Sequence, residues 1–256
     1  MLPDERKRRI VEILSTQGRV KVDDLSDMFN ISKVTIRNDL RELEKEKPWI
    51  KRIYGGAVIQ EGSKLEISFR EKERKNIEEK VCIARKAVEF IRPGDSVIFD
   101  GGTTTLQIAK ELKKASIEDV TVVTNSLFIA VELVDVPTVE LIVTGGVKRE
   151  NSYSLIGPLS EKVLSEVHVD KAFLGTTGFS KNCEFMTPSI MEAETKRRLM
   201  AVSDKHFIVT DSSKFDRVAF AVFARGDEID YVLTDKGISE DVKRLLEENG
   251  IEVIIC

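Results

Sequence analysis

The chain has 256 residues, of which 41% are hydrophobic, enough for one large domain or two modest ones. It contains neither a run of the roughly 20 apolar residues that a membrane helix needs nor a secretory signal at its start, so we expect a cytoplasmic protein. Charge is uneven, because residues 1–60 carry 13 Lys and Arg against 10 Asp and Glu, and the rest carries 27 against 34. Such a balance suits a protein that contacts nucleic acid at one end, although a difference this small also arises by chance.

Three helical patterns occupy the first 46 residues. The first ends at Gly18, the second begins near Val22 and breaks at Asn30 and Ile31, and the third restarts at Ser32, a residue type that caps helices well. The spacing of the apolar residues places one stripe of each helix in a shared core. The predicted core residues are Ile10, Ile13, Leu14, Val22, Leu25, Met28, Phe29, Ile36, Leu40 and Leu43.

The third helix has a polar face opposite its apolar stripe. Cations that bind phosphate, together with an amide that reads a base edge, are what a helix in the major groove of DNA requires. A solvated amphipathic helix would show the same pattern, since Arg and Lys are common on outer faces. The face consists of Val34, Asn38, Arg41 and Lys45, flanked by Thr35 and Arg37.

The stretch WIKRIYGGAVI predicts a short hairpin after the third helix, with its turn at Gly55 and Gly56. A tight turn between the second and third helices, followed by a basic hairpin, predicts a winged helix-turn-helix domain over residues 1–57 that binds double-stranded operator DNA. The expected DNA contacts are Ser32, Lys33, Val34, Thr35, Arg37, Asn38, Arg41, Lys45, Lys51, Arg52 and Tyr54.

These residues resemble the DeoR family of bacterial regulators, and both the order and the spacing of the shared words hold. The words are VTIRNDL at residues 34–40, then Leu43 and Glu44, then KRIYGGA at residues 51–57. The chain departs from the family pattern at Asn38, where Arg is usual, at Lys47-Pro48, which replaces a glycine-containing turn, and at Tyr54, which replaces His. Because Asn can pair with adenine, we expect the change at residue 38 to alter operator preference rather than abolish binding.

Residues 58–72 are expected to be a linker, because they lack sustained periodicity and contain Gly62 and Ser63, and a helix is expected to begin near Arg70. From Ser96 onward, short apolar runs alternate with helical patterns, which predicts a mostly parallel α/β domain over residues 73–256. The runs are SVIFD, VTVVTN, VELIVTGG, KAFLGTTG, HFIVTD, YVLTD and EVIIC.

Nearly every one of these runs ends on small or hydrogen-bonding residues. The carboxyl ends of parallel strands face the ligand crevice of an open α/β sheet, so these ends should converge on one ligand site. The ends are Asp100 to Thr104, Thr124-Asn125, Thr144 to Gly146, Gly175 to Gly178, Thr210-Asp211 and Thr234-Asp235.

The stretch FDGGTTTLQIAKEL is the strongest candidate for binding an anion such as phosphate. Glycines let the backbone approach a ligand, while Thr hydroxyls and the N–H groups at a helix start meet negative charge. A plain strand-to-helix turn with Thr caps explains the same residues. The stretch matches neither the Walker P-loop nor the G-x-G-x-x-G fingerprint.

Two later segments also carry charged candidates. Glu192 and Lys196 are spaced as a surface ion pair on a helix, although Lys196 could instead reach a ligand oxygen. The segment DSSKF offers Asp211 to a sugar hydroxyl and Lys214 to an anion, but a capped helix start explains Asp211 equally well.

These words of the large domain, from the loop at Asp100 to DSSKF, also resemble the DeoR family. The resemblance implies a sensor domain similar to ribose-5-phosphate isomerase and CoA-transferase-like folds, which binds phosphorylated sugars or related metabolites. It implies ligand contacts at Asp100, Gly102, Thr103, Thr104, Asn125, Gly145, Gly175, Lys196 and Lys214, to which we add Arg149 for phosphate and Asp211 for a hydroxyl.

Metal and cofactor chemistry is not indicated. Cys82, Cys183 and Cys256 include no C-x-x-C pair, and two histidines, His168 and His206, are too few for an imidazole cluster. We therefore expect no cofactor and no metal.

Three functions fit the sequence. The leading one is a homodimeric or larger regulator, a repressor of sugar metabolism as the family resemblance implies, in which a sugar phosphate changes DNA affinity. The second is a sugar-phosphate isomerase-like enzyme with a DNA-binding head, in which Asp100, Asp211, Glu192 and Lys196 form an acid-base set. The third is a DNA-binding protein whose large domain only drives oligomerisation.

Overall fold

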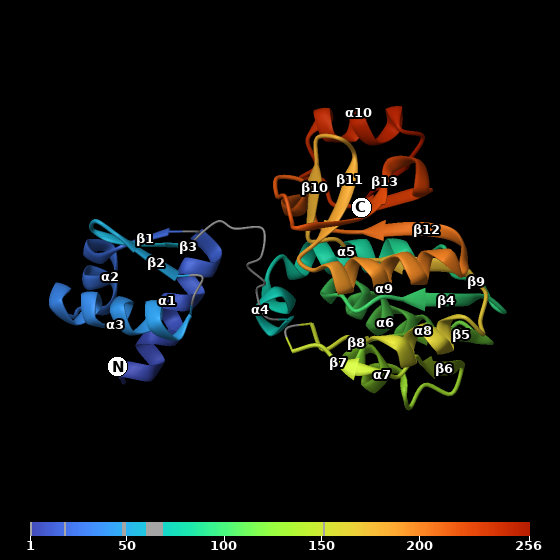
Figure 1. Cartoon of the computed structure of the whole chain (residues 1–256), viewed down its shortest axis with the longest axis horizontal. Coiled ribbons are helices and arrows are strands. Elements are labelled where there is room, and N and C mark those ends of the chain that lie inside the picture. Colours follow the sequence, from blue (N-terminus) through green and yellow to red (C-terminus); the bar gives the residue numbers. More distant parts are fainter. Residues whose placement is uncertain (1, 18, 48–49, 60–68, 151) are drawn as a thin grey trace. The chain divides into compact units, whose positions relative to one another are not determined.

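The computed structural model describes residues 2–17, 19–47, 50–59, 69–150 and 152–256. The predicted helix end at Gly18, the Pro48 position of the expected turn, and the Gly62-Ser63 boundary lie outside these residues. The chain forms two compact units, Met1–Leu65 and Glu66–Cys256 (Figure 1).

The first unit is a winged helix-turn-helix, as predicted. Three helices pack on a three-stranded antiparallel sheet in the order β1-β3-β2. Its elements are α1 (Pro3–Gln17), β1 (Arg19–Lys21), α2 (Val22–Phe29), α3 (Lys33–Glu46), β2 (Ile50–Ile53) and β3 (Gly56–Ile59).

Local geometry explains the turn between α2 and α3. Asn30 adopts the left-handed conformation, with φ 51°, that ends α2, and Asn tolerates this region better than most residues. Ser32 caps α3, because its hydroxyl accepts a hydrogen bond of 3.2 Å from the Thr35 amide. Gly55, at φ 79°, forms the tip of the wing between β2 and β3.

The predicted stripes of α1 and α3 are confirmed, since Ile10, Ile36 and Leu40 are buried in one core. One prediction on α2 is wrong, because Met28 is 60% exposed. Met28 lies about 100° around the helix from Phe29, at the edge of the apolar stripe. Because α2 has only about two turns, the edge of its stripe stays outside the core.

A buried ion pair joins α1 to α3. The Arg6 guanidinium donates to both carboxylate oxygens of Asp39, with Nε to Oδ2 at 2.6 Å and Nη2 to Oδ1 at 3.0 Å. Both side chains are 7% exposed. This fork fixes the orientation of α3 against α1 more narrowly than apolar packing alone would.

The second unit is built on a seven-stranded sheet in the order β15-β14-β12-β9-β4-β5-β6, with every neighbouring pair parallel. All seven apolar runs predicted from the sequence are strands of this sheet. They are β4 (Ser96–Phe99), β5 (Val120–Thr124), β6 (Val139–Val143), β9 (Val169–Leu174), β12 (Ser203–Val209), β14 (Tyr231–Thr234) and β15 (Glu252–Ile255).

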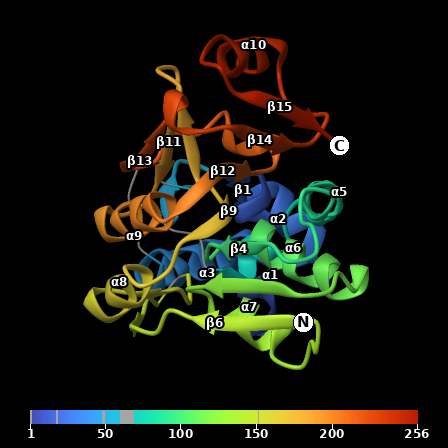
Figure 2. The same cartoon turned by 90° about the vertical axis from the view of Figure 1, so that its right-hand side faces the viewer.

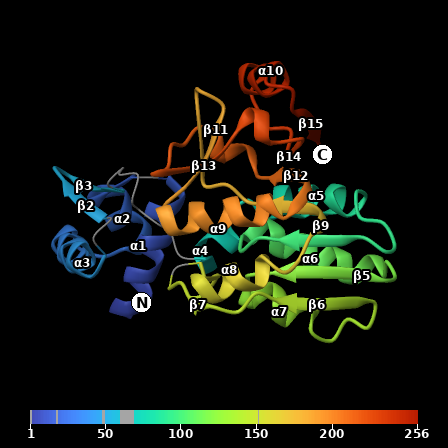
Figure 3. The ribbon, with the colours of Figure 1, turned by 45° about the vertical axis from the view of Figure 1, so that its right-hand side comes forward.

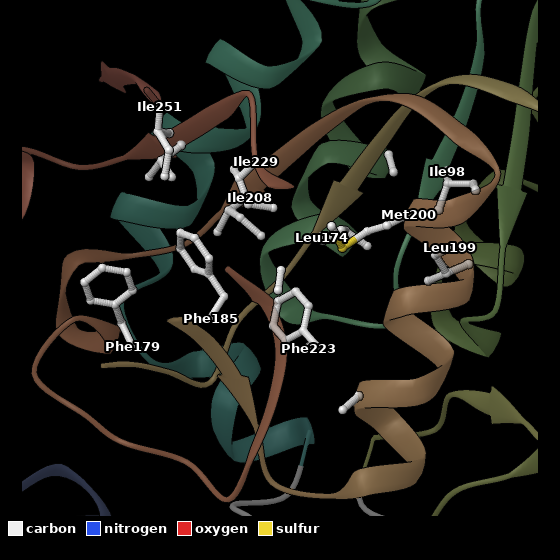
Figure 4. Packing of buried hydrophobic residues seen from close by; sticks show 14 of the residues in the cluster. Ile98, Leu174, Phe179, Phe185, Leu199, Met200, Ile208, Phe223, Ile229 and Ile251 are labelled. Carbon is white, nitrogen blue, oxygen red and sulfur yellow. The ribbon is translucent and has the colours of Figure 1, made fainter. Parts of the chain in front are cut away.

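Helices cover both faces of this sheet (Figures 2 and 3). One face packs against α5 (Ile77–Val88), α6 (Thr103–Ala115) and α7 (Leu127–Leu133), and the other against α8 (Pro158–Leu164), α9 (Ile190–Ala201) and α10 (Glu240–Glu248). Because successive strand residues point to opposite faces, Phe99 and Phe173 enter the first core, while Ile98 and Leu174 enter the second (Figure 4). No helix in the described ranges is long and apolar enough to cross a membrane.

Two small antiparallel sheets were not predicted. One joins β7 (Val147–Lys148) to β8 (Leu155–Ile156), and the other has the order β10 (Gly178–Ser180), β11 (Glu184–Thr187) and β13 (Ala221–Arg225). The second sheet contributes Phe179, Phe185 and Phe223 to the core shown in Figure 4. The strands β7, β8 and β10 have only two or three residues, which is too short for a pattern to stand out in the sequence.

The second unit begins with a helix, α4 (Phe69–Arg74), that packs on its own core. Phe69 lies within the range expected to be a linker, yet it is buried and stacks on Phe128 with ring centroids 4.6 Å apart. The end of α4 is held by Lys80 of α5, whose buried ammonium donates to the backbone carbonyls of Lys72 and Lys75. A lysine is therefore used here as a structural cross-link.

The first prediction concerns the Arg6–Asp39 pair. Arg6→Met should destabilise the first unit by about 3 kcal/mol, because it leaves the buried Asp39 carboxylate without its partner. This value is the lower end of the loss for breaking a buried pair, since this pair lies near the surface of a small domain. Urea unfolding followed by the fluorescence of Trp49, the single tryptophan, measures this loss.

Lys33→Met is the matched control, because it breaks a pair with Asp23 in which the two side chains are 54% and 68% exposed. Such a pair contributes at most about 1 kcal/mol. Equal losses in the two variants would contradict a structural role for the buried fork.

The second prediction concerns pH. Burial lowers the pKa of Lys80 to about 8 from 10.5, against the opposing influence of Asp211, Glu73 and Glu79. Between these pH values the unfolded chain holds a proton that the folded chain has released, so this group makes the folded state more stable as pH rises. The gain should approach about 2–3 kcal/mol and be absent in Lys80→Met.

Urea unfolding of both proteins at intervals from pH 7 to pH 10.5 tests this expectation. Lys86→Met, on the exposed side of the same helix, controls for the loss of a lysine. A stability difference between wild type and Lys80→Met that does not change with pH would refute the assignment.

Candidate functional site

The sheet reverses its direction of growth between β4 and β9. From β4 the chain proceeds outward through β5 and β6, and from β9 it proceeds the other way through β12, β14 and β15. At such a point the connections that leave adjacent strands diverge, and ligands bind there at the carboxyl ends of the strands in open α/β folds. Asp100 follows β4 and Gly175 follows β9, so the topology brings together two of the predicted site residues.

A buried ion pair occupies this point. Lys196 of α9 binds the Asp100 carboxylate and also donates to the Gly175 carbonyl at 2.8 Å, and both charged residues are 3% exposed. The Gly175 amide donates to Asp100 at 3.3 Å. A surface pair between Glu192 and Lys196 is therefore wrong, because Lys196 turns into the sheet end instead.

The amino end of α6 lies beside this pair. Gly102 caps the helix, and the Thr105 hydroxyl donates to the Asp100 carbonyl at 2.6 Å, which ties the helix start to the strand end. Thr103 and Thr104 form the first turn and are 9% and 7% exposed. The first N–H groups of a helix have no partner within it, so this end carries partial positive charge.

Asn125, after β5, is buried, and no described group donates to its Oδ1 atom. The oxygen lies 3.5 Å from the point that a Cβ atom on Gly101 would occupy, so it faces the same loop. Gly101 itself admits no side chain, because that Cβ would lie 1.9 Å from the hydroxyl of Ser154. Ser154 was not predicted, since it belongs to an irregular stretch with no motif.

Arg149 is paired with Glu192, its Nη1 atom 2.9 Å from the carboxylate, and the side chains are 18% and 14% exposed. Gly145 follows β6, two strands from β4, and has φ 67°, with open space where a side chain would project.

Asp211 and Lys214 form a second cluster after β12, with Lys214 Nζ 2.9 Å from Asp211 Oδ2. Asn76, between α4 and α5, donates to Asp211 Oδ1 at 2.7 Å, and Ser213 bonds to the same oxygen. Burial alone raises the pKa of Asp211, but Lys214 and the hydrogen bonds from Ser213, Lys214 and Asn76 hold it below its usual value. Asn76 was missed from the sequence because its partners are 135 and 137 residues away, and Lys80 because its ammonium binds backbone carbonyls, which leave no sequence motif.

On the first unit, the predicted DNA face of α3 is solvent-exposed at Val34, Arg37, Asn38, Arg41 and Lys45. Arg41 Nη1 lies 3.2 Å from the Asn38 amide oxygen, so the unusual Asn38 is held by its neighbour one turn on.

The cations around this face fall into two groups. Lys33 pairs with Asp23 at 2.7 Å, and Arg52 of the wing pairs with Glu44 of α3 at 2.9 Å. Hydrogen bonds from the Arg52 backbone and side chain lower the pKa of Glu44. Among the residues that the structure describes, no ion pair involves Arg37, Lys45 or Lys51, and Tyr54 projects fully into solvent.

Both units match known families. Residues 6–62 match the DeoR-like helix-turn-helix domain, and residues 75–236 match the DeoR C terminal sensor domain.

Similar proteins are matched from end to end. The putative aga operon transcriptional repressor of Escherichia coli O157:H7 is 39% identical over 98% of this chain and 93% of its own length. The HTH-type transcriptional regulator GlpR of Haloferax volcanii is 39% identical over 99% of this chain and 98% of its own. The lactose phosphotransferase system repressor of Staphylococcus epidermidis is 32% identical, covering 98% of each chain.

Solved structures align with part of the chain. Ribose 5-phosphate isomerase A from Methanocaldococcus jannaschii aligns over 55% of each chain, with a TM-score of 0.41 and 15% identity. The delta subunit of eIF2B from Chaetomium thermophilum aligns over 62% of this chain and 56% of its own, with a TM-score of 0.47 and 18% identity. With its winged helix-turn-helix, its parallel α/β unit and relatives matched along their whole length, this chain belongs to the DeoR family of transcriptional regulators.

Proposed function

We propose that this protein represses genes of sugar metabolism and that a phosphorylated sugar, bound at the strand ends of the second unit, changes its affinity for operator DNA. The observation that carries the proposal is the meeting of the buried Asp100–Lys196 pair with the amino end of α6 at the reversal point of the sheet. The names of the aga operon and lactose phosphotransferase repressors support a sugar-related role.

Charge pairing favours one placement of the phosphate. Lys196, Arg149 and Lys214 each already face a carboxylate, whereas the amino end of α6 offers positive potential with no acidic residue in its first turn. We therefore assign the phosphate to Gly102, Thr103 and Thr104, where the first N–H groups of the helix can bind an anion. The N–H of Gly102 already donates to the Asp100 carbonyl and to the Thr105 hydroxyl, so Gly102 contributes room for the ligand rather than a donor.

The remaining candidate residues suit the hydroxyl groups of the sugar. Carboxylates accept hydrogen bonds from sugar hydroxyls and ammonium groups donate to them, so Asp100, Lys196 and Asp211 can serve hydroxyls without a new net charge. The buried, unpartnered oxygen of Asn125 can accept one more. Arg149, Lys214, Gly145 and Gly175 complete the proposed site.

On the DNA side, we assign sequence reading to α3 and phosphate contacts to the helix and the wing. Asn38 and Arg37 are placed against bases, because the first turns of a recognition helix reach base edges in the major groove. Lys45 and Lys51 are placed against phosphates. Lys33 and Arg52 reach DNA only by leaving Asp23 and Glu44, so we assign them smaller contributions.

A single helix-turn-helix reads few base pairs, so we propose that the protein acts in the cytoplasm as a homodimer or larger oligomer on paired half-sites. Residues 1–57 form the reading head in this proposal and residues 73–256 the sensor, with 58–72 between them. An enzymatic role is not proposed, because each candidate acid or base is held by an opposite charge: Lys196 by Asp100, Glu192 by Arg149 and Asp211 by Lys214.

Thermal unfolding with a panel of sugar phosphates and their unphosphorylated parents tests the sensor. A ligand at about 100 times its Kd adds roughly 2.7 kcal/mol of stability, so the effector should raise the melting temperature clearly, and its parent sugar should not. Thr104→Val removes a hydroxyl at the start of α6 but keeps the backbone N–H groups, so it should reduce the shift. Thr121→Val is the control and should preserve it, because the Thr121 hydroxyl, near the amino end of β5, bonds to Glu140 of β6.

A panel without any shift would count against a phosphorylated effector. A shift of the same size in Thr104→Val and in the wild type would remove the Thr104 hydroxyl from the site.

Binding to a duplex selected by this protein from a random library tests the head. Arg37→Ala should reduce the slope of log affinity against log salt by about one unit if Arg37 contacts phosphate, and should relax sequence preference if it reads a base. Arg244→Ala, an exposed arginine on α10, is the control and should change neither. Affinity, slope and preference all unchanged in Arg37→Ala would remove Arg37 from the interface.

A further inference from the structure

Asn76 directs its side chain away from the helix that it begins. An Asn at a helix start normally accepts a hydrogen bond from that helix, but Asn76 makes no such cap, because its backbone is left-handed at φ 50°. Its amide instead donates to Asp211 Oδ1 at 2.7 Å and to the Ser213 hydroxyl at 3.2 Å, across 135 and 137 residues of sequence. The residue therefore connects the α4–α5 junction to the loop after β12.

Lys80, one turn into α5, makes the second connection. Its ammonium is buried and donates to the carbonyls of Lys72 and Lys75, which close the end of α4. The backbone amide of Lys80 donates to the Asn76 carbonyl at 3.1 Å, and Asp211 and Lys214 influence the pKa of Lys80 in opposite directions. The position of α4 thus depends on a residue that is bonded to Asn76, the partner of Asp211.

We propose that Asn76 and Lys80 are positioning residues that transmit changes in the Asp211–Lys214 loop to α4. Helix α4 follows residues 60–68, through which the second unit connects to the DNA-binding unit along the chain. The inference rests on the proposed function in one respect, namely that the effector contacts this loop.

The bonds around Asp211 explain how the transmission works. A carboxylate oxygen has about two lone-pair sites, and Oδ1 already accepts from Asn76 and Ser213. A ligand hydroxyl that donates to Oδ1 must displace a present donor, of which Asn76 is one. A ligand hydroxyl oxygen that draws Lys214 away from Asp211 changes the charges that act on Lys80. Either change reaches Asn76 or Lys80 directly, and through them the end of α4.

Hydrogen exchange of the full-length, ligand-free protein tests this link. Asn76→Gly removes the amide while suiting the left-handed backbone, and Asp211→Ala removes the acceptor from the other side. Each variant should speed exchange in residues 69–80 by about tenfold, the effect of losing a hydrogen bond. The double variant should exchange no faster than the faster single variant, because both remove the same interaction.

Asn30→Gly is the matched control, since Asn30 has the same left-handed backbone at φ 51° but ends α2 in the other unit. It should leave residues 69–80 unchanged. Lys80→Met gives a second way to loosen α4 if Asp211→Ala fails to fold, and it should speed the same residues.

Unchanged exchange in Asn76→Gly, or rates that multiply in the double variant, would overturn the proposal. Because these proteins carry no ligand, a failed thermal-shift panel would refute the proposed effector without affecting this result.

Discussion

The buried pair of Asp100 and Lys196 is the interaction on which the second unit depends. Asp100 precedes α6, which covers one face of the sheet, while Lys196 belongs to α9 on the other face. The pair therefore joins both helical layers at the sheet end, and Gly175 secures it to the neighbouring strand. Burying two charges costs free energy that is offset only when the charges are paired and hydrogen-bonded. The backbone around Asp100 and Gly175 must therefore keep the geometry of this pair.

Much of this architecture could be predicted from the sequence because it follows from local patterns. The seven apolar runs are strands of the sheet, since the parts of parallel strands that lie between two helical layers are largely apolar. Their polar ends could be placed at one edge because parallel strands finish together. Likewise, Ser32 and Gly55 mark the turn and the wing through backbone preferences that act within a few residues.

The partners of the charged residues could not be predicted, because they depend on the folded topology. Lys196 is four residues from Glu192 but binds Asp100, which lies 96 residues away. Glu192 in turn pairs with Arg149, 43 residues away. Asn76 and Lys80 sit in a segment without any recognisable motif, and Met28 lies at the edge of a stripe where spacing does not decide burial.

These existing pairs determine what a ligand can do to the protein. Where Lys214, Arg149 and Lys196 already bind carboxylates, a ligand group that binds one of these cations must exchange bonds with its carboxylate. A ligand shifts a conformational equilibrium only through such differences in contacts between states. In the proposed function this coupling is reciprocal, so operator binding would change the affinity for the effector by the same factor.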